Sequence, residues 1–292
     1  MELQFYKLAA GKSDLILVNL MDEVAPADNL LSRITRALCR RRTGVGANGV
    51  VFLLPGSRHQ ISLRYFLAGG FESLLFAEPV LYASRYLFDM GIIGKKGFVI
   101  ETKTGEVPIR LIDSSNFAIS LGVPKDAKGN GITDGSESAI ESLALIYNSE
   151  YRGKVPLTLI DLGLSGAVFF REESLKNNRE YALRLIESLD IRDADEWIPI
   201  GVLPYRGDEI AVRSWGRFGS GHPVTTAAIG AVASMIHGFS ERSSLVYVRG
   251  SRFFVQWREG DSVVDVSGSA EYIFAGNYFF DEEDDDNQQV ED

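Results

Sequence analysis

The sequence predicts an α+β protein of two pseudo-symmetric halves, each a mostly antiparallel sheet wrapped around a central helix. Two observations carry this prediction. Apolar runs with the period of strands recur along the chain and are separated by glycine-containing turns. Each half also has one apolar helix that is entered at a residue–proline step, Glu78–Pro79 in the first half and His222–Pro223 in the second. We therefore predict an internal duplication.

The elements of the first half follow from the spacing of apolar residues and from the glycines and prolines between them. A helix is predicted over 29–42, and a second over 79–90 that is closed by Gly91. The segments predicted as strands are LQFYKLAA, DLILVNL, VVFLLP, ISLRYFLA, GFVIETKTGEVPIRLID and NFAISLGVP.

The second half repeats this order after KDAKGNGITDGSES, a polar, glycine-rich crossover. Helices are predicted over 172–189 and over 223–237, the latter closed by Gly238. Strands are predicted for VPLTLIDLG, GAVFF, WIPIGVLPY, DEIAVRSWG, SLVYVRG, RFFVQWREG and SVVDVSG. The expected boundaries are 1–124 for the first half, with 270–280 returning to it, and 125–269 for the second.

Composition excludes several classes of function. Apolar residues make up 45% of the 292 residues and charged residues 24%, which is typical of a globular protein. The single cysteine, Cys39, excludes an internal disulfide and a cysteine-based metal cluster. We find no apolar run of bilayer length, no secretory leader and no basic stripe with interleaved aromatics, so we expect a cytoplasmic protein that binds neither membrane nor nucleic acid.

The last twelve residues, 281–292, hold eight acids and no base. They contribute −8 of the net charge of −10, so the rest of the chain is nearly neutral. Like charges with almost no apolar neighbours repel one another, and we predict a disordered acidic tail. Such a tail either keeps the protein soluble or docks on a basic partner, and we favour the first role.

Four blocks of sequence, spread over nearly the whole chain, resemble diaminopimelate epimerase. They are FYKLAAGKSDLILVN, LCRRRTGVGANGVVFLL, RYFLAGGFESLLFAEPVLYASRYLFDMG and FFVQWREGDSVVDVSGSAEYIFAG. The resemblance implies the fold described above and the possibility of a homodimer. It also implies a cofactor-independent reaction, in which two cysteines at the starts of the two central helices exchange protons with opposite faces of a substrate carbon.

The chain departs from that family where the chemistry is performed. Gapless alignment places Phe76 and Pro223 at the two cysteine positions, and neither side chain can carry a proton. Positions where the family has polar substrate-binding residues hold other residue types. Four of these positions, which we expect to line the site, are Ser13, Leu67, Leu164 and Trp215. Two more are Gly166, where the family has a histidine in a strand of the second half, and Ser214.

The helix entries ESLLFAEPVLYAS and GHPVTTAAIGA also resemble those of the phenazine-biosynthesis isomerases, which use no cysteine. Glu78 and His222 precede the two prolines, so we expect them at the helix N-caps, facing one cleft. One hypothesis is a pseudoenzyme that binds an unknown small molecule or protein. The alternative is a cofactor-independent isomerase or lyase with Glu78 and His222 as acid and base. Retained diaminopimelate epimerase activity is a distant third.

Overall fold

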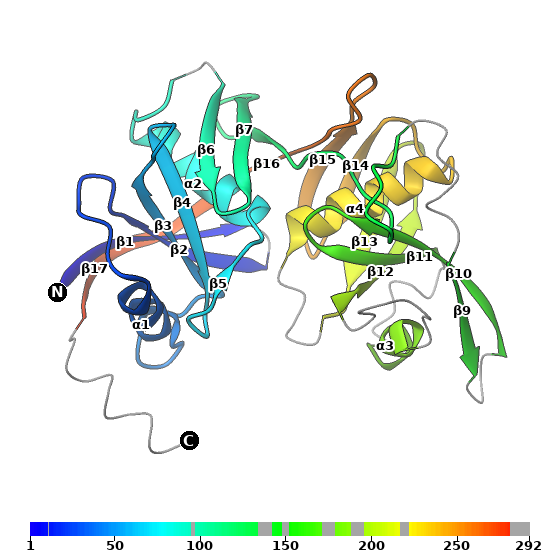
Figure 1. Cartoon of the computed structure of the whole chain (residues 1–292), viewed down its shortest axis with the longest axis horizontal. Helices are drawn as coiled ribbons and strands as arrows, with labels where there is room; N and C mark the ends of the chain where they lie inside the picture. Colours follow the sequence, from blue (N-terminus) through cyan, green and yellow to red (C-terminus); the bar gives the residue numbers. More distant parts are fainter. Residues whose placement is uncertain are drawn as a thin grey trace. The chain divides into compact units, whose positions relative to one another are not determined.

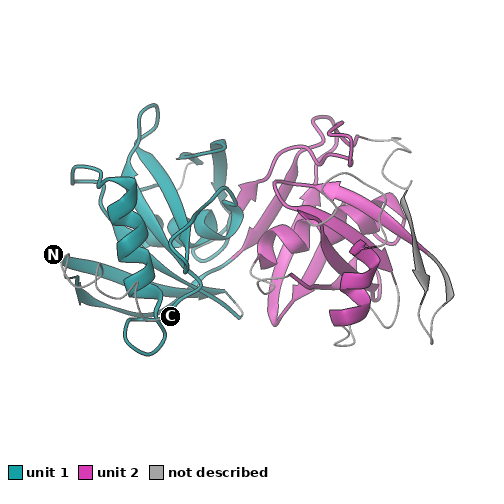
Figure 2. Ribbon diagram, turned by 60° about the horizontal axis from the view of Figure 1, so that its bottom comes forward, with its two compact units in different colours: residues 1–117, 269–292 teal, residues 118–268 magenta. Residues whose placement is uncertain are grey.

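In the computed structural model, the chain forms two compact units, Met1–Phe117 with Ser269–Asp292, and Ala118–Gly268 (Figure 2). The structure describes residues 1–10, 12–94, 97–133, 142–147, 152–170, 179–187, 196–216 and 222–280. Within these ranges it has four helices and seventeen strands, which confirms the predicted α+β class. No helix in the described ranges is long and apolar enough to cross a membrane.

Unit 1 is built on a sheet in which the first and the last strand of the chain lie side by side (Figure 1). Its strands are β1 (Glu2–Ala10), β2 (Ser13–Asn19), β3 (Gly49–Pro55), β4 (Ile61–Leu67), β5 (Glu72–Ser73), β6 (Phe98–Thr102), β7 (Gly105–Leu111) and β17 (Glu271–Phe279). The returning strand β17 pairs antiparallel with β1, and β1 pairs antiparallel with β2. β2 and β3 are parallel, and β3 and β4 are antiparallel.

Two helices pack on this sheet. α1 (Asp28–Cys39) places its apolar face in a core with β1, β2 and β3. It ends three residues before the predicted end at residue 42, because Arg40 has extended backbone angles. α2 (Ala77–Asp89) is buried from Ala77 to Ser84 and contacts β2 and β3. It is the predicted central helix of the first half, and Gly91 follows its end with a φ of 68°.

Unit 2 has a longer series of strands around one helix. The strands are β8 (Phe117–Ser120), β9 (Ser142–Tyr147), β10 (Arg152–Asp161), β11 (Ser165–Phe170), β12 (Ile198–Pro204), β13 (Glu209–Ser214), β14 (Ser243–Val248), β15 (Ser251–Trp257) and β16 (Val264–Gly268). α4 (Pro223–Ile236) contacts every strand from β10 to β16. All its residues from Pro223 to Ser234 are buried, as expected for an apolar helix with a sheet wrapped around it.

The remaining helix, α3 (Arg179–Glu187), covers part of the sheet of unit 2 near β12. The helix predicted over 172–189 extends beyond this range into residues that the structure does not describe. Residues 134–138 of the predicted crossover and the acidic tail, 281–292, also lie outside the described residues. The internal duplication stays a prediction.

Candidate functional site

The start of α2 carries the first of the two cysteine positions. Phe76 is the N-cap residue and is half-buried, and the amide of Val80 donates to its carbonyl oxygen at 2.8 Å. We predicted Glu78 at the N-cap, and this was wrong: Glu78 lies inside the first turn. The helix can begin two residues before Pro79 because proline is tolerated in the first turn, where the amide hydrogen that it lacks would have no partner within the helix.

The carboxylate of Glu78 lies in a buried, polar part of unit 1. Glu78 is 2% exposed. Burial raises the pKa of the Tyr65 phenol, on β4, above its ordinary value, and the charge of Glu78 raises it further. Tyr82, one turn along α2, also has a raised pKa, first through burial and in part through Glu78. Both phenols are therefore neutral hydrogen-bonding groups close to Glu78.

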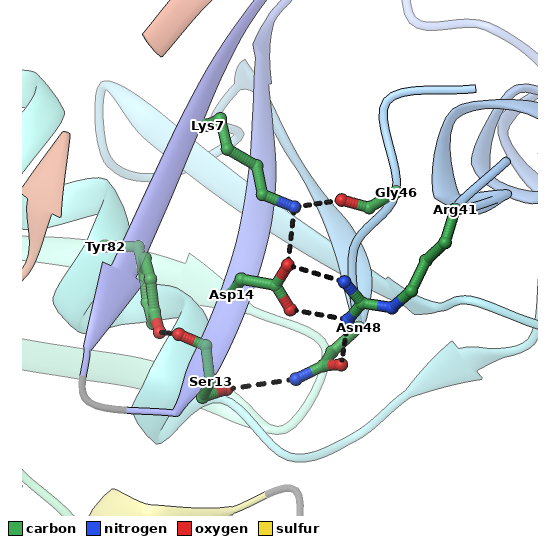
Figure 3. Close-up of polar contacts among 7 residues, drawn as sticks. All are labelled: Lys7, Ser13, Asp14, Arg41, Gly46, Asn48 and Tyr82. Atoms are coloured by element: carbon green, nitrogen blue, oxygen red, sulfur yellow. Dashed lines mark hydrogen bonds and ion pairs between the residues drawn. The ribbon is translucent and has the colours of Figure 1, made fainter. Parts of the chain in front are cut away.

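A network of charges holds the opening strands β1 and β2 against the loop between α1 and β3, residues 40–48, which we call the glycine loop (Figure 3). The ammonium of Lys7, on β1, contacts the carboxylate of Asp14, on β2, at 2.6 Å, and donates to the carbonyl oxygen of Gly46. Arg41 closes the other side of Asp14, with Nη2 at 2.9 Å from Oδ1 and Nη1 at 3.2 Å from Oδ2. The Lys7 side chain is 5% exposed and that of Arg41 is 61% exposed. The Lys7–Asp14 ion pair is therefore largely buried, whereas the Arg41–Asp14 ion pair faces solvent.

Burial alone would raise the pKa of Asp14, but the hydrogen bonds from Arg41 and Lys7 outweigh it and lower that pKa. The carboxylate is therefore ionised at neutral pH. It positions Lys7 so that the ammonium holds the carbonyl of Gly46, a residue with a φ of 78°. This left-handed conformation requires glycine, and the loop takes a defined shape because Lys7 holds it there.

Asn48 connects this network to Ser13, one of the predicted site residues. Its side-chain oxygen accepts from Arg41 at 3.0 Å, and its side-chain nitrogen lies 3.5 Å from Oγ of Ser13. The hydroxyl of Tyr82 donates to the backbone oxygen of Ser13 at 2.9 Å. The network thus reaches α2 through buried Ser13 (Figure 3).

Lys7, Asp14, Arg41 and Asn48 are not among the predicted site residues, although the sequence holds one signal for them. A lysine in the middle of the apolar strand LQFYKLAA needs a buried counter-charge.

Leu67, another predicted site residue, ends β4 opposite Gly49 and is 37% exposed.

The start of α4 carries the second cysteine position, in unit 2. His222 is the N-cap residue, as predicted, and Pro223 is the first helical residue. The amide of Thr226 donates to the carbonyl oxygen of His222 at 2.9 Å. The hydroxyl of Thr226 lies 3.5 Å from that of Ser214, at the end of β13, so Ser214 faces this helix.

The position of the family's strand histidine, Gly166 on β11, has no room for a side chain. A Cβ atom there would lie 2.7 Å from Cδ1 of Ile200 and 2.8 Å from Cγ2 of Ile229 in α4. Both isoleucines are fully buried. Apolar atoms therefore occupy the space in which the resemblance implies a polar ring, while Leu164 is half-buried just before β11.

The structure places Trp215 in the core under α3 and not beside the start of α4. Its indole stacks on the ring of Phe169 at a centroid distance of 5.9 Å and belongs to the same apolar cluster as Tyr181 and Leu185 of α3. The physical reason is the alternation of side chains along an extended chain: Ser214 faces α4, so its neighbour Trp215 faces the other side of the sheet.

Glu78 lies in unit 1 and His222 in unit 2. That they face one cleft therefore stays a prediction.

Cys39, the last residue of α1, cannot replace the missing thiols. It is 4% exposed and packs in the core of unit 1. Burial raises the pKa of its thiol to about 12, so almost no thiolate exists at neutral pH.

We expect Cys39 in the native protein to be unreactive toward a thiol reagent, and to react with one equivalent once the chain is unfolded in urea. Colorimetric titration with and without denaturant is the measurement. Rapid labelling of the native protein at neutral pH would contradict the burial described above.

Comparison with known proteins agrees with the resemblance read from the sequence. No protein-family model matches the chain. It is 26% identical over 287 residues to a diaminopimelate epimerase from Moorella thermoacetica, which covers 94% of this chain and 99% of the relative. It is 27% identical over 288 residues to a diaminopimelate epimerase from Pelotomaculum thermopropionicum, with coverage of 94% and 99%.

Two solved structures have a similar fold. One is a protein of the phenazine biosynthesis protein PhzF family from Enterococcus faecalis, with a TM-score of 0.63, 13% identity and coverage of 96% of this chain and 100% of the other. The other is a hydroxyproline epimerase from Agrobacterium vitis, with a TM-score of 0.66, 14% identity and coverage of 97% and 94%. The predicted resemblance to diaminopimelate epimerase is confirmed. The predicted resemblance to the phenazine-biosynthesis isomerases is confirmed at the level of the fold.

Proposed function

The chain resembles diaminopimelate epimerases along nearly its whole length and has the fold of these isomerases, and from this premise we propose that it is a pseudoenzyme with a binding or regulatory role. One observation carries the proposal. The two positions at which a thiol would act hold Phe76 and Pro223, and the only cysteine of the chain is buried in the core with a raised pKa. Two-thiol epimerisation needs a thiolate on one side of the substrate and a thiol on the other, and the chain supplies neither.

The neighbourhood of α4 supports the same proposal. Ile200 and Ile229 fill the space beside Gly166, so a polar ring cannot be accommodated without displacing core atoms. A polar site that has been replaced by packed aliphatic side chains gains stability and loses the groups that would bind an amino acid substrate.

Glu78 motivates a second candidate function, a cofactor-independent isomerase or lyase. A carboxylate that is 2% exposed, beside two neutral phenols, is typical of a group that transfers protons. In this alternative, Glu78 takes a proton from the substrate carbon and His222 returns one. A pseudoenzyme would bind a small molecule or a protein partner without exchanging a proton with it. An isomerase or lyase would bind a small substrate and exchange a proton on its carbon.

We expect no exchange of the α-proton of diaminopimelate when the purified protein is incubated with it in D2O. Proton NMR of the recovered amino acid is the measurement, and a relative that has both cysteines is the positive control. Exchange above the uncatalysed background would overturn the pseudoenzyme proposal.

The same assay, run over a panel of amino acids and hydroxy acids, separates the alternatives. If exchange is found with any of them, it should be abolished in both Glu78→Gln and His222→Asn for the acid/base alternative to hold. Exchange that survives both substitutions would contradict that alternative as well.

A further inference from the structure

The β12–β13 hairpin and β14 of unit 2 form a pocket that is lined by none of the predicted site residues. It has a volume of about 460 Å³ and is lined by Tyr205, Arg206, Glu209, Ala211 and Tyr247. This volume lies in the range of small-molecule sites. β12, β13 and β14 lie side by side in the sheet (Figure 1).

The pocket opens on the face of the sheet that α4 does not cover. Gly230 of α4 approaches Val212 and Val202, so these two side chains point toward the helix. Because side chains alternate along a strand, Ala211 points to the other face, and Tyr247 is its direct partner across the β13–β14 pair. The floor of the pocket is thus a small residue beside an aromatic ring on the outer surface.

Four of the five residues that line the pocket have a polar side chain. Among the described residues, the side chains of Arg206 and Glu209 form no ion pair, and the hydroxyls of Tyr205 and Tyr247 form no hydrogen bond. Tyr205 is 56% exposed and Tyr247 is 37% exposed. An arginine and a glutamate that line one pocket without pairing to each other can each bind a group of opposite charge on a ligand.

We propose that this pocket binds a free amino acid with a flat, apolar side chain. The guanidinium of Arg206 donates to the α-carboxylate, and the carboxylate of Glu209 accepts from the α-ammonium. The flat side chain packs on Ala211 against the rings of Tyr205 and Tyr247.

L-tryptophan is the ligand to use, with saturation-transfer NMR on the full chain. We expect saturable binding with a Kd on the order of 1 mM, because the pocket is open to solvent and holds the ligand on one side. Tryptamine, which lacks the carboxylate, and indole-3-propionate, which lacks the ammonium, should each bind about tenfold more weakly. Tyr247→Ala should abolish binding.

Charge-specific variants make the assignment sharper. Glu209→Gln should weaken binding of tryptophan and leave indole-3-propionate unchanged, whereas Arg206→Gln should weaken both. Glu259→Gln, an exposed glutamate in the same unit, is the matched control and should change nothing.

The proposal is overturned if tryptophan shows no saturable binding at millimolar concentration, or if its Kd is the same in Tyr247→Ala. Indole that binds as tightly as tryptophan would also overturn it, since the charged groups would then play no part. If Tyr247→Ala fails to fold, Tyr205→Ala and the two charge variants decide the same question.

Discussion

Replacing Asp14 by Asn is expected to lower the free energy of unfolding by about 1.5–3 kcal/mol, the usual contribution of hydrogen bonds to charged groups, because the Asp14 side chain is 19% exposed and its ion pair with Lys7 is only partly buried. Asparagine has nearly the same shape, so packing is unchanged and the loss is electrostatic. The ammonium of Lys7 remains buried, with the carbonyl of Gly46 as its contact but no negative charge beside it. Urea denaturation followed by circular dichroism is the measurement.

Arg41→Ala is the matched comparison, because Arg41 binds the same carboxylate from the solvent side. With 61% of its side chain exposed, it should contribute no more than about 1 kcal/mol. The double variant Lys7→Met with Asp14→Asn should recover much of the loss, since no charge is then buried alone. Equal losses for Asp14→Asn and Arg41→Ala would contradict the assignment of Lys7 as the buried partner.

The pH dependence of the Asp14 contribution follows from the lowered pKa of that carboxyl. A folded-state pKa below the unfolded one, near 3.9, means that the contribution is fully present above about pH 4. It is lost as the pH falls through the folded-state pKa. The stability difference between the wild type and Asp14→Asn should therefore be constant at neutral pH and shrink in acid.

The sequence predicted the fold class and both central helices because apolar periodicity and the proline entries are local signals. The end of α1 and the place of Glu78 in the first turn of α2 were predicted wrongly, since both depend on backbone angles that neighbouring residues do not fix. In the network around Asp14, Lys7 contacts Gly46, which lies 39 positions further along the chain. Only the three-dimensional packing of β1, β2 and the glycine loop brings them together.

The candidate site shows the same limit. Alignment alone suggests that Trp215 and Gly166 are equivalent losses of polar residues. The structure separates them: Trp215 packs under α3, on the other side of the sheet from Ser214, whereas Gly166 lies against α4. Which face of a strand a residue occupies depends on register, and a shift of one residue reverses it.

Gly166→His, which restores the residue type that the family has at this position, is expected to destabilise the protein by about 3 kcal/mol or more. Overpacking a core typically costs about 1–3 kcal/mol. Burying an imidazole without a hydrogen-bond partner adds about 1–3 kcal/mol. The added Cβ would lie 2.8 Å from Cγ2 of Ile229, whose χ1 is strongly restricted in a helix, and 2.7 Å from the more mobile Cδ1 of Ile200.

A double-mutant cycle with Ile229→Ala tests this reasoning. Ile229→Ala alone should cost about 2–5 kcal/mol, because it leaves a cavity in a fully buried position. Combined with Gly166→His, it should cost clearly less than the sum of the two single changes, since the ring then enters the space that the isoleucine vacates. Leu164→Asn, a half-buried position just outside β11, serves as the control and should have little effect. Additive losses in the cycle would mean that Ile229 does not fill the place of the missing ring, and would remove the support that unit 2 gives to the pseudoenzyme proposal.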